Sequence, residues 1–345
     1  MAKLSLPITK EWLILLYRDI WFMVPDRTMD RQKNRLNMRK ILIFASTVFA
    51  MLCAGACQEK GLGDASGEVS VNISLELPAE QTKAMSMAEL TDVVYYEVWN
   101  SDWTIRLHPG EGEGPVSVPM SDKRACLELT LVTSQTYNVI FWAQNKACGA
   151  YDVTDLQKVG VDYSVIAADG NQDKYDAFYA YEQFKVTGPF DETVVLHRPF
   201  AQLNFGADSM QTTLGDVKVE STSVTVSRLA TVFNTVTGLG ENEVTDVVFE
   251  AKGLATDENL MVVGEPYTWV TMDYMLMMDA HDAVEVDAVF NVGMEAPVKH
   301  NISSVPLRKN YRTNIVGDIF TSDARLTIVV DPDFIQPDEV VEVVQ

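Results

Sequence analysis

The residue types that carry catalysis are present in this sequence, but their spacing matches no catalytic motif. The chain has 345 residues and four histidines, and no histidine has a partner at metal-ligand spacing. Neither a glycine-rich phosphate loop nor the GxSxG and HExxH motifs occur. With 49 acidic side chains, a carboxylate pair suited to glycoside hydrolysis would arise by chance. We therefore predict a protein that is not an enzyme, with no catalytic residue, metal site or cofactor.

Residues 169–173 (DGNQD) resemble the start of a calcium-binding loop, because oxygen-bearing side chains stand at alternate positions. The sixth position is Lys174, where the loop needs glycine, and the twelfth is Ala180, where it needs glutamate. We interpret this segment as an Asx-rich turn.

Aromatic side chains offer a different chemistry, which is stacking on sugar rings. Trp142 and Trp269 lie inside apolar segments, so we expect them in the core. Trp103 lies in a polar hairpin and is the best candidate for an exposed ring. An alternative function is therefore a monomeric outer-membrane lipoprotein that binds glycans, with Trp103, or Tyr95 and Tyr96, as the stacking platform.

One cysteine stands where a lipid is attached in exported lipoproteins. A short basic region at residues 39–40 precedes an uncharged apolar run at 41–52, and small residues at 54–56 lead to Cys57. The apolar run is shorter than the roughly 20 residues that span a bilayer, which argues against a transmembrane helix. We predict a lipoprotein signal peptide at 38–56 and a lipid anchor, palmitate included, on Cys57 at the outer membrane.

The net charge of the chain after residue 57 bears on whether a nucleic acid can be its partner. Residues 1–37 do not resemble a leader, and we interpret them as an upstream extension that is not translated. Without residues 1–57, the chain holds 18 basic and 45 acidic side chains, a net charge of −27. Because such a chain is repelled by phosphates, we expect no nucleic-acid partner.

Two cysteines remain after the predicted signal peptide, Cys126 and Cys148. An oxidising compartment permits them to form a disulfide, and two buried thiols are an equally good interpretation.

Alternating apolar and polar residues predict strands almost throughout. A polar tether at 57–68 precedes the strand at 69–77, in which Val, Ile and Leu recur at every second position. Residues 127–131 and 137–143 predict a hairpin, and 284–292 repeat the alternation in the second half. A proline follows His197 and Arg198, where we place a domain boundary. We predict an all-β protein with β-sandwiches at 69–196 and 197–345.

Two segments carry a family resemblance. Residues 196–206 (LHRPFAQLNFG) and 310–334 (NYRTNIVGDIFTSDARLTIVVDPDF) resemble the fimbrillin-like pilin lipoproteins of Gram-negative anaerobes. The resemblance implies two transthyretin-like, Greek-key β-sandwich domains and a non-enzymatic role as a fimbrial or adhesin subunit. It implies fimbrial subunits as partners, with surface glycans or proteins as further ligands.

The resemblance also implies assembly by β-strand exchange, in which a protease removes the first strand and a neighbouring subunit supplies a replacement. The removed strand is then 69–77, the candidate processing site lies between Lys83 and Ala84, and the donor strand is 340–344. Processing places the protein in a fimbrium.

Overall fold

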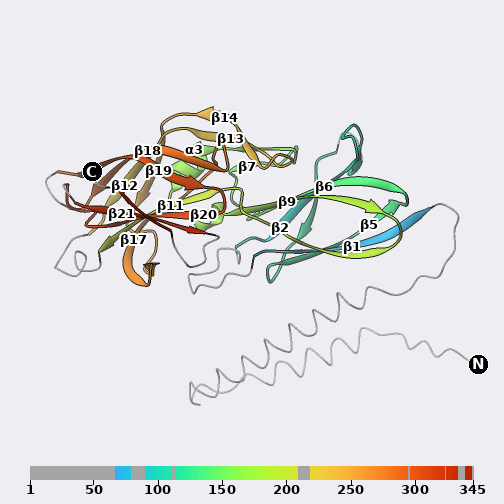
Figure 1. The fold of residues 1–345 in the computed structure, drawn as a ribbon, viewed down its shortest axis with the longest axis horizontal. Coiled ribbons are helices and arrows are strands. Elements are labelled where there is room, and N and C mark those ends of the chain that lie inside the picture. The colour runs from blue at the N-terminus through green and yellow to red at the C-terminus, as the bar shows by residue number, and fades with distance from the viewer. Residues whose placement is uncertain are drawn as a thin grey trace, which may run out of the picture. The chain divides into compact units, whose positions relative to one another are not determined.

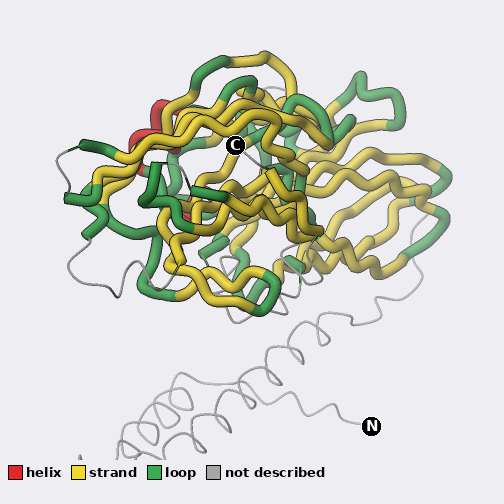
Figure 2. Tube along the Cα trace, turned by 60° about the vertical axis from the view of Figure 1, so that its left-hand side comes forward, coloured by secondary structure: helices red, strands yellow, loops and turns green. Residues whose placement is uncertain are grey.

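Strands make up almost all of the regular structure, which confirms the predicted all-β class. The computed structural model describes residues 67–78, 90–110, 113–208, 218–293, 296–322, 324–332 and 339–343. The chain divides into two compact units, Met1–Gly63 and Asp64–Gln345, and the first unit lies outside the described residues. Figure 2 shows that helix in the second unit is confined to one short region.

A first hydrophobic core lies between two sheets in the N-terminal half. Its strands are β1 Glu68–Glu76, β2 Val93–Asn100, β3 Arg106–His108, β4 Val116–Pro119, β5 Arg124–Val132, β6 Gln135–Gln144, β9 Ala177–Val186 and β10 Phe190–Val195. One sheet has the order β10-β1-β5, and the other has the order β3-β2-β6-β9 with β4 also paired to β2. Figure 1 labels β1 and β5 of the first sheet and β2, β6 and β9 of the second. Apolar side chains from both sheets form one buried cluster, so this half is a β-sandwich.

The predicted hairpin at 127–131 and 137–143 is wrong, although both strands exist. β5 pairs with β1, whereas β6 pairs with β2 and β9 in the facing sheet. The backbone N–H groups of the turn between them form hydrogen bonds with other segments. Thr133 N–H donates to Gly67 O, and Ser134 N–H donates to Val186 O. Two alternating segments joined by a short turn therefore span the two layers.

A second core occupies the C-terminal half. The strands are β7 Tyr151–Asp152, β8 Lys158–Val161, β11 Ala201–Asp208, β12 Ser221–Val226, β13 Leu229–Asn234, β14 Leu239–Val244, β15 Val247–Lys252, β16 Asn259–Val262, β17 Glu265–Met275, β18 His281–Asn291, β19 Val298–Arg308, β20 Tyr311–Gly317, β21 Leu326–Pro332 and β22 Glu339–Val343. The helical segments are α3 Tyr163–Ile166, η2 Ala167–Asp169 and η3 Asp173–Tyr175. Three sheets have the orders β16-β17-β11-β20-β21-β22, β15-β12-β18-β19 and β14-β13-β8-β7.

The segment from β7 to η3 departs from the first sandwich and packs in the second core. β8 pairs with β13, and apolar side chains of this segment belong to the C-terminal cluster. A buried ion pair then fixes the return of the chain, because Arg198 Nε lies 3.0 and 2.9 Å from the two carboxylate oxygens of Asp176. The division at residue 197 stays a prediction.

Candidate functional site

The strand slot, which we define as the position of β1 between β5 and β10, is the best-defined structural feature of the N-terminal half. β1 is antiparallel to β5 over nine residue pairs and parallel to β10 over six. Val71, Ile73 and Leu75 point into the core and are fully buried, as the alternation predicts. Burying three such side chains contributes on the order of 5–9 kcal/mol. Without β1, this sandwich would have two unpaired strand edges and an open apolar groove.

Polar contacts hold the solvent face of the strand slot. Asn72 Nδ2 donates to Asp191 Oδ1 at 2.7 Å on β10, and Arg124 pairs with Glu76 at 2.8 Å on β5. Both contacts join exposed groups, so each adds little to stability. The buried alternate side chains therefore dominate the binding of β1 in its slot.

The residues predicted for export and processing are Cys57, Lys83 and Ala84, and all three lie outside the described residues. The predicted donor strand corresponds to β22, which pairs antiparallel with β21 at the end of the six-stranded sheet. Among the described strands, β22 pairs with one neighbour, whereas β1 pairs with two.

A second feature is the aromatic cluster, which we define as Trp99, Trp103 and Tyr181. The ring centroids of Trp99 and Trp103 are 6.1 Å apart, and those of Trp103 and Tyr181 are 5.5 Å apart. Trp103 was predicted to be an exposed ring, but it is half-buried between the other two. All three side chains keep part of their surface exposed to solvent.

A buried polar layer lies beneath the aromatic cluster. Glu97 is completely buried, and it accepts hydrogen bonds from Trp99 Nε1 at 3.0 Å and from Arg106 at 2.7 Å. Burial raises the pKa of Glu97, and these two hydrogen bonds partly offset that effect. Asn138 is also completely buried and accepts a hydrogen bond from Tyr181 OH at 2.9 Å.

The other predicted aromatic positions divide between core and surface. Tyr95 and Tyr96 do not form one platform, because adjacent residues of β2 point to opposite faces and Tyr96 is buried in the first core. Trp142 and Trp269 are buried, as predicted.

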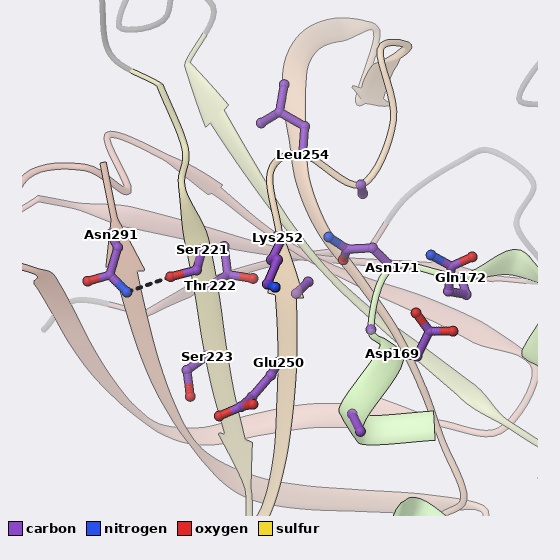
Figure 3. Close-up of a pocket in the computed structure, with 14 residues that line it drawn as sticks. Asp169, Asn171, Gln172, Ser221, Thr222, Ser223, Glu250, Lys252, Leu254 and Asn291 are labelled. Carbon is purple, nitrogen blue, oxygen red and sulfur yellow. Dashed lines mark hydrogen bonds between the residues drawn. The ribbon is translucent and has the colours of Figure 1, made fainter. Parts of the chain in front are cut away.

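A polar pocket with a volume of about 550 Å³ lies in the C-terminal half. Figure 3 shows the side chains that line it. One wall is the loop at residues 168–172, and the other is formed by β12, β15 and Asn291 of β18. Asn291 Nδ2 donates to Ser221 Oγ at 2.8 Å. The lining carries amide, hydroxyl, carboxylate and ammonium groups but no aromatic ring, so it offers hydrogen bonds without a stacking surface.

The calcium-like segment forms one wall of this pocket. Lys174 Nζ donates to Asp169 at 2.5 Å, and this hydrogen bond lowers the pKa of the Asp169 carboxyl group. Among the described residues, no three His, Cys, Asp or Glu side chains gather where they would hold a metal ion. The same described part contains no helix long and apolar enough to cross a membrane.

The two cysteines lie in different environments. Cys126 is on the exposed face of β5, whereas Cys148 is buried in the second core, where burial raises the pKa of its thiol. A disulfide between them stays a prediction.

A model of a protein family, described as a family of unknown function (DUF6562), matches residues 63–344. The chain belongs to this family. No curated protein matches the chain. The description of DUF6562 does not mention fimbrillins, so membership in the fimbrillin-like group stays a prediction.

Solved structures that are similar to this DUF6562 chain include two fimbrial proteins. A fimbrial assembly protein from Parabacteroides distasonis is 15% identical, with 79% of this chain and 100% of that chain covered and a TM-score of 0.40. The tip fimbrial protein Mfa3 from Porphyromonas gingivalis is 8% identical, with 77% and 99% covered and a TM-score of 0.44. TM-scores and identities this low do not indicate the function of this chain.

Sequence reasoning missed most of the aromatic cluster and its polar layer. Successive side chains of a strand point to opposite faces, so Tyr95, Glu97 and Trp99 lie on one face of β2. This alternation alone would have grouped Glu97 with Trp99. No local signal connects them to Tyr181, which reaches the cluster only because β9 pairs with β6.

Proposed function

We propose that this DUF6562 chain is a non-enzymatic cell-surface lipoprotein, anchored through Cys57, that assembles with other fimbrial or adhesin subunits by β-strand exchange. The observation that carries the proposal is the strand slot. β1 is the first described strand, it follows the predicted tether, and it fills a groove bounded by two strands. Its loss would create both an edge for hydrogen bonding and pockets for alternate side chains.

The edge position of β22 supports its role as donor. A strand with one ladder can leave its sheet with fewer broken hydrogen bonds than a central strand. β22 has the sequence EVVEV, whose apolar residues suit a groove lined by apolar side chains.

A cleavage experiment tests this proposal. The full chain is treated with a lysine-specific protease and examined by mass spectrometry and native electrophoresis. We expect a new N-terminus at Ala84 followed by a ladder of oligomers. Lys83→Gln should block both events, whereas Lys185→Gln, at an exposed position on β9, should block neither.

A second variant separates cleavage from exchange. A chain that ends at residue 338 lacks β22, so it should be cleaved at Lys83 and remain monomeric. Oligomers formed by this truncated chain would exclude β22 as the donor. Cleavage that releases β1 without any oligomers in the full chain would contradict strand exchange.

A further inference from the structure

The aromatic cluster is held in a fixed arrangement by groups that are themselves buried. Glu97 orients Trp99 and Arg106, and Asn138 orients Tyr181 and Gln183 through hydrogen bonds of 2.9 and 3.0 Å. The Trp99 indole N–H and the Tyr181 hydroxyl both donate to this buried layer. Trp103 and Tyr181 also pack partly against the second core. The surface that the three rings leave open to a ligand is therefore the exposed remainder of their apolar faces.

The backbone of Trp103 is strained. Its φ is 62°, which lies in the left-handed region. Glycine and asparagine adopt this region at little energetic cost, whereas a bulky side chain is strained there. The hairpin is rigid at this point, because Asn100 Oδ1 accepts from the N–H groups of both Thr104 and Ile105 at 2.9 and 3.0 Å. A tryptophan at a strained position of a rigid turn suggests a function for its ring.

Polar groups lie at the border of the cluster. The Arg106 guanidinium carbon is 5.9 Å from the centroid of Trp99, and Gln183 is exposed on β9. Ring surfaces beside guanidinium and amide groups match the chemistry of a sugar, which has C–H faces and hydroxyl edges. The rings are inclined by 45–46° to their neighbours, which suits a twisted chain of sugar units better than a flat molecule.

We propose that Trp99, Trp103 and Tyr181 form a binding site for a neutral saccharide chain, with the exposed Gln183 contacting its hydroxyl groups. The chain's net charge of −22 opposes anionic glycans, so the ligand class is neutral. The site lies on the face of β2, β6 and β9 opposite the first core. It is independent of the strand slot, so it does not require strand exchange.

Titration of the full, uncleaved chain with four neutral oligosaccharides tests the proposal. The probes are maltoheptaose, cellohexaose, mannohexaose and xylohexaose. Their binding is measured by calorimetry and by tryptophan fluorescence emission. We expect at least one to bind and to shift the emission. Trp99→Ala and Trp103→Ala should each weaken that binding at least tenfold. Ile105→Ala changes a 48% exposed side chain of the same hairpin and should leave affinity within twofold.

Trp103→Asn distinguishes loss of the ring from loss of the fold. Asparagine adopts positive φ readily, so this variant should keep the wild-type circular dichroism and a single cooperative unfolding transition and still lose binding. Three outcomes would each overturn the proposal: none of the four sugars binds, both alanine variants bind like wild type, or the cluster instead mediates self-association that Trp103→Ala abolishes. None of these outcomes bears on cleavage at Lys83 or on the oligomer ladder.

Discussion

At the scale of single residues, a buried carboxyl group lies behind the pocket loop. Asp273 on β17 is 3% exposed and accepts a hydrogen bond from the Asn171 backbone N–H. The Asn171 side chain accepts from Met272 N–H at 2.8 Å, and Gly170 N–H donates to Glu250 O at 3.0 Å. The loop therefore joins β15 of one sheet to β17 of another. The turn predicted from DGNQD has this structural role in addition to its place in the pocket wall.

Asp273→Asn should stabilise the protein at neutral pH. Burial raises the pKa of Asp273 from 3.8 to about 7, so between these values the folded state keeps a proton that the unfolded state releases. The contribution of Asp273 to stability therefore falls as pH rises from about 4 to about 7 and is level above that. We expect Asp273→Asn to raise the free energy of unfolding by about 2–4 kcal/mol at pH 8 and to change it little at pH 4.

Urea denaturation at both pH values measures this difference. Asp122→Asn, at an exposed turn position, is the matched control and should have no effect at either pH. An equal gain at pH 4 and pH 8 would show that the effect of Asp273→Asn does not come from its ionisation.

At the scale of elements, β1 and its neighbour β5 each carry one buried face, so the cost of shortening a side chain depends on the face it occupies. Ile73 on β1 is 1% exposed, whereas Val132 at the end of β5 is 42% exposed. Ile73→Ala should lower the free energy of unfolding by about 2–4 kcal/mol, because it leaves a cavity in the first core. Val132→Ala should change it by less than about 0.5 kcal/mol. Denaturation of both variants checks this, and similar costs at the two positions would contradict the burial of β1.

Local patterns predicted individual strands better than their partners. The alternation at 69–77 identified β1 nearly to the residue, since one face of that strand is buried. The same pattern in β5 and β6 was misread as a hairpin, because alternation reveals a buried face but not which strand lies beside it. β19 was not predicted, because Pro306 and the adjacent serines interrupt its alternation. The pocket and the aromatic cluster depend on such non-local pairings.

At the scale of the whole molecule, charge and anchoring are connected. The part of the chain after Cys57 has a net charge of −27, so it is repelled by anionic membrane surfaces. Net charge therefore opposes electrostatic attraction to anionic lipids, and our proposal assigns the attachment to lipid on Cys57. Stable anchoring by lipid takes about two acyl chains, since one chain binds only reversibly.

Cys57→Ser should move the protein from the outer-membrane fraction to the soluble fraction and abolish incorporation of labelled palmitate. Cys53→Ser is the matched control, because it changes the same atom four residues earlier and lies within the predicted signal peptide. It should leave both measurements unchanged. If the Cys57→Ser protein remained in the membrane fraction, attachment would come from another segment. In that case cleavage at Lys83 would no longer be expected to release the subunit, although it would still open the strand slot.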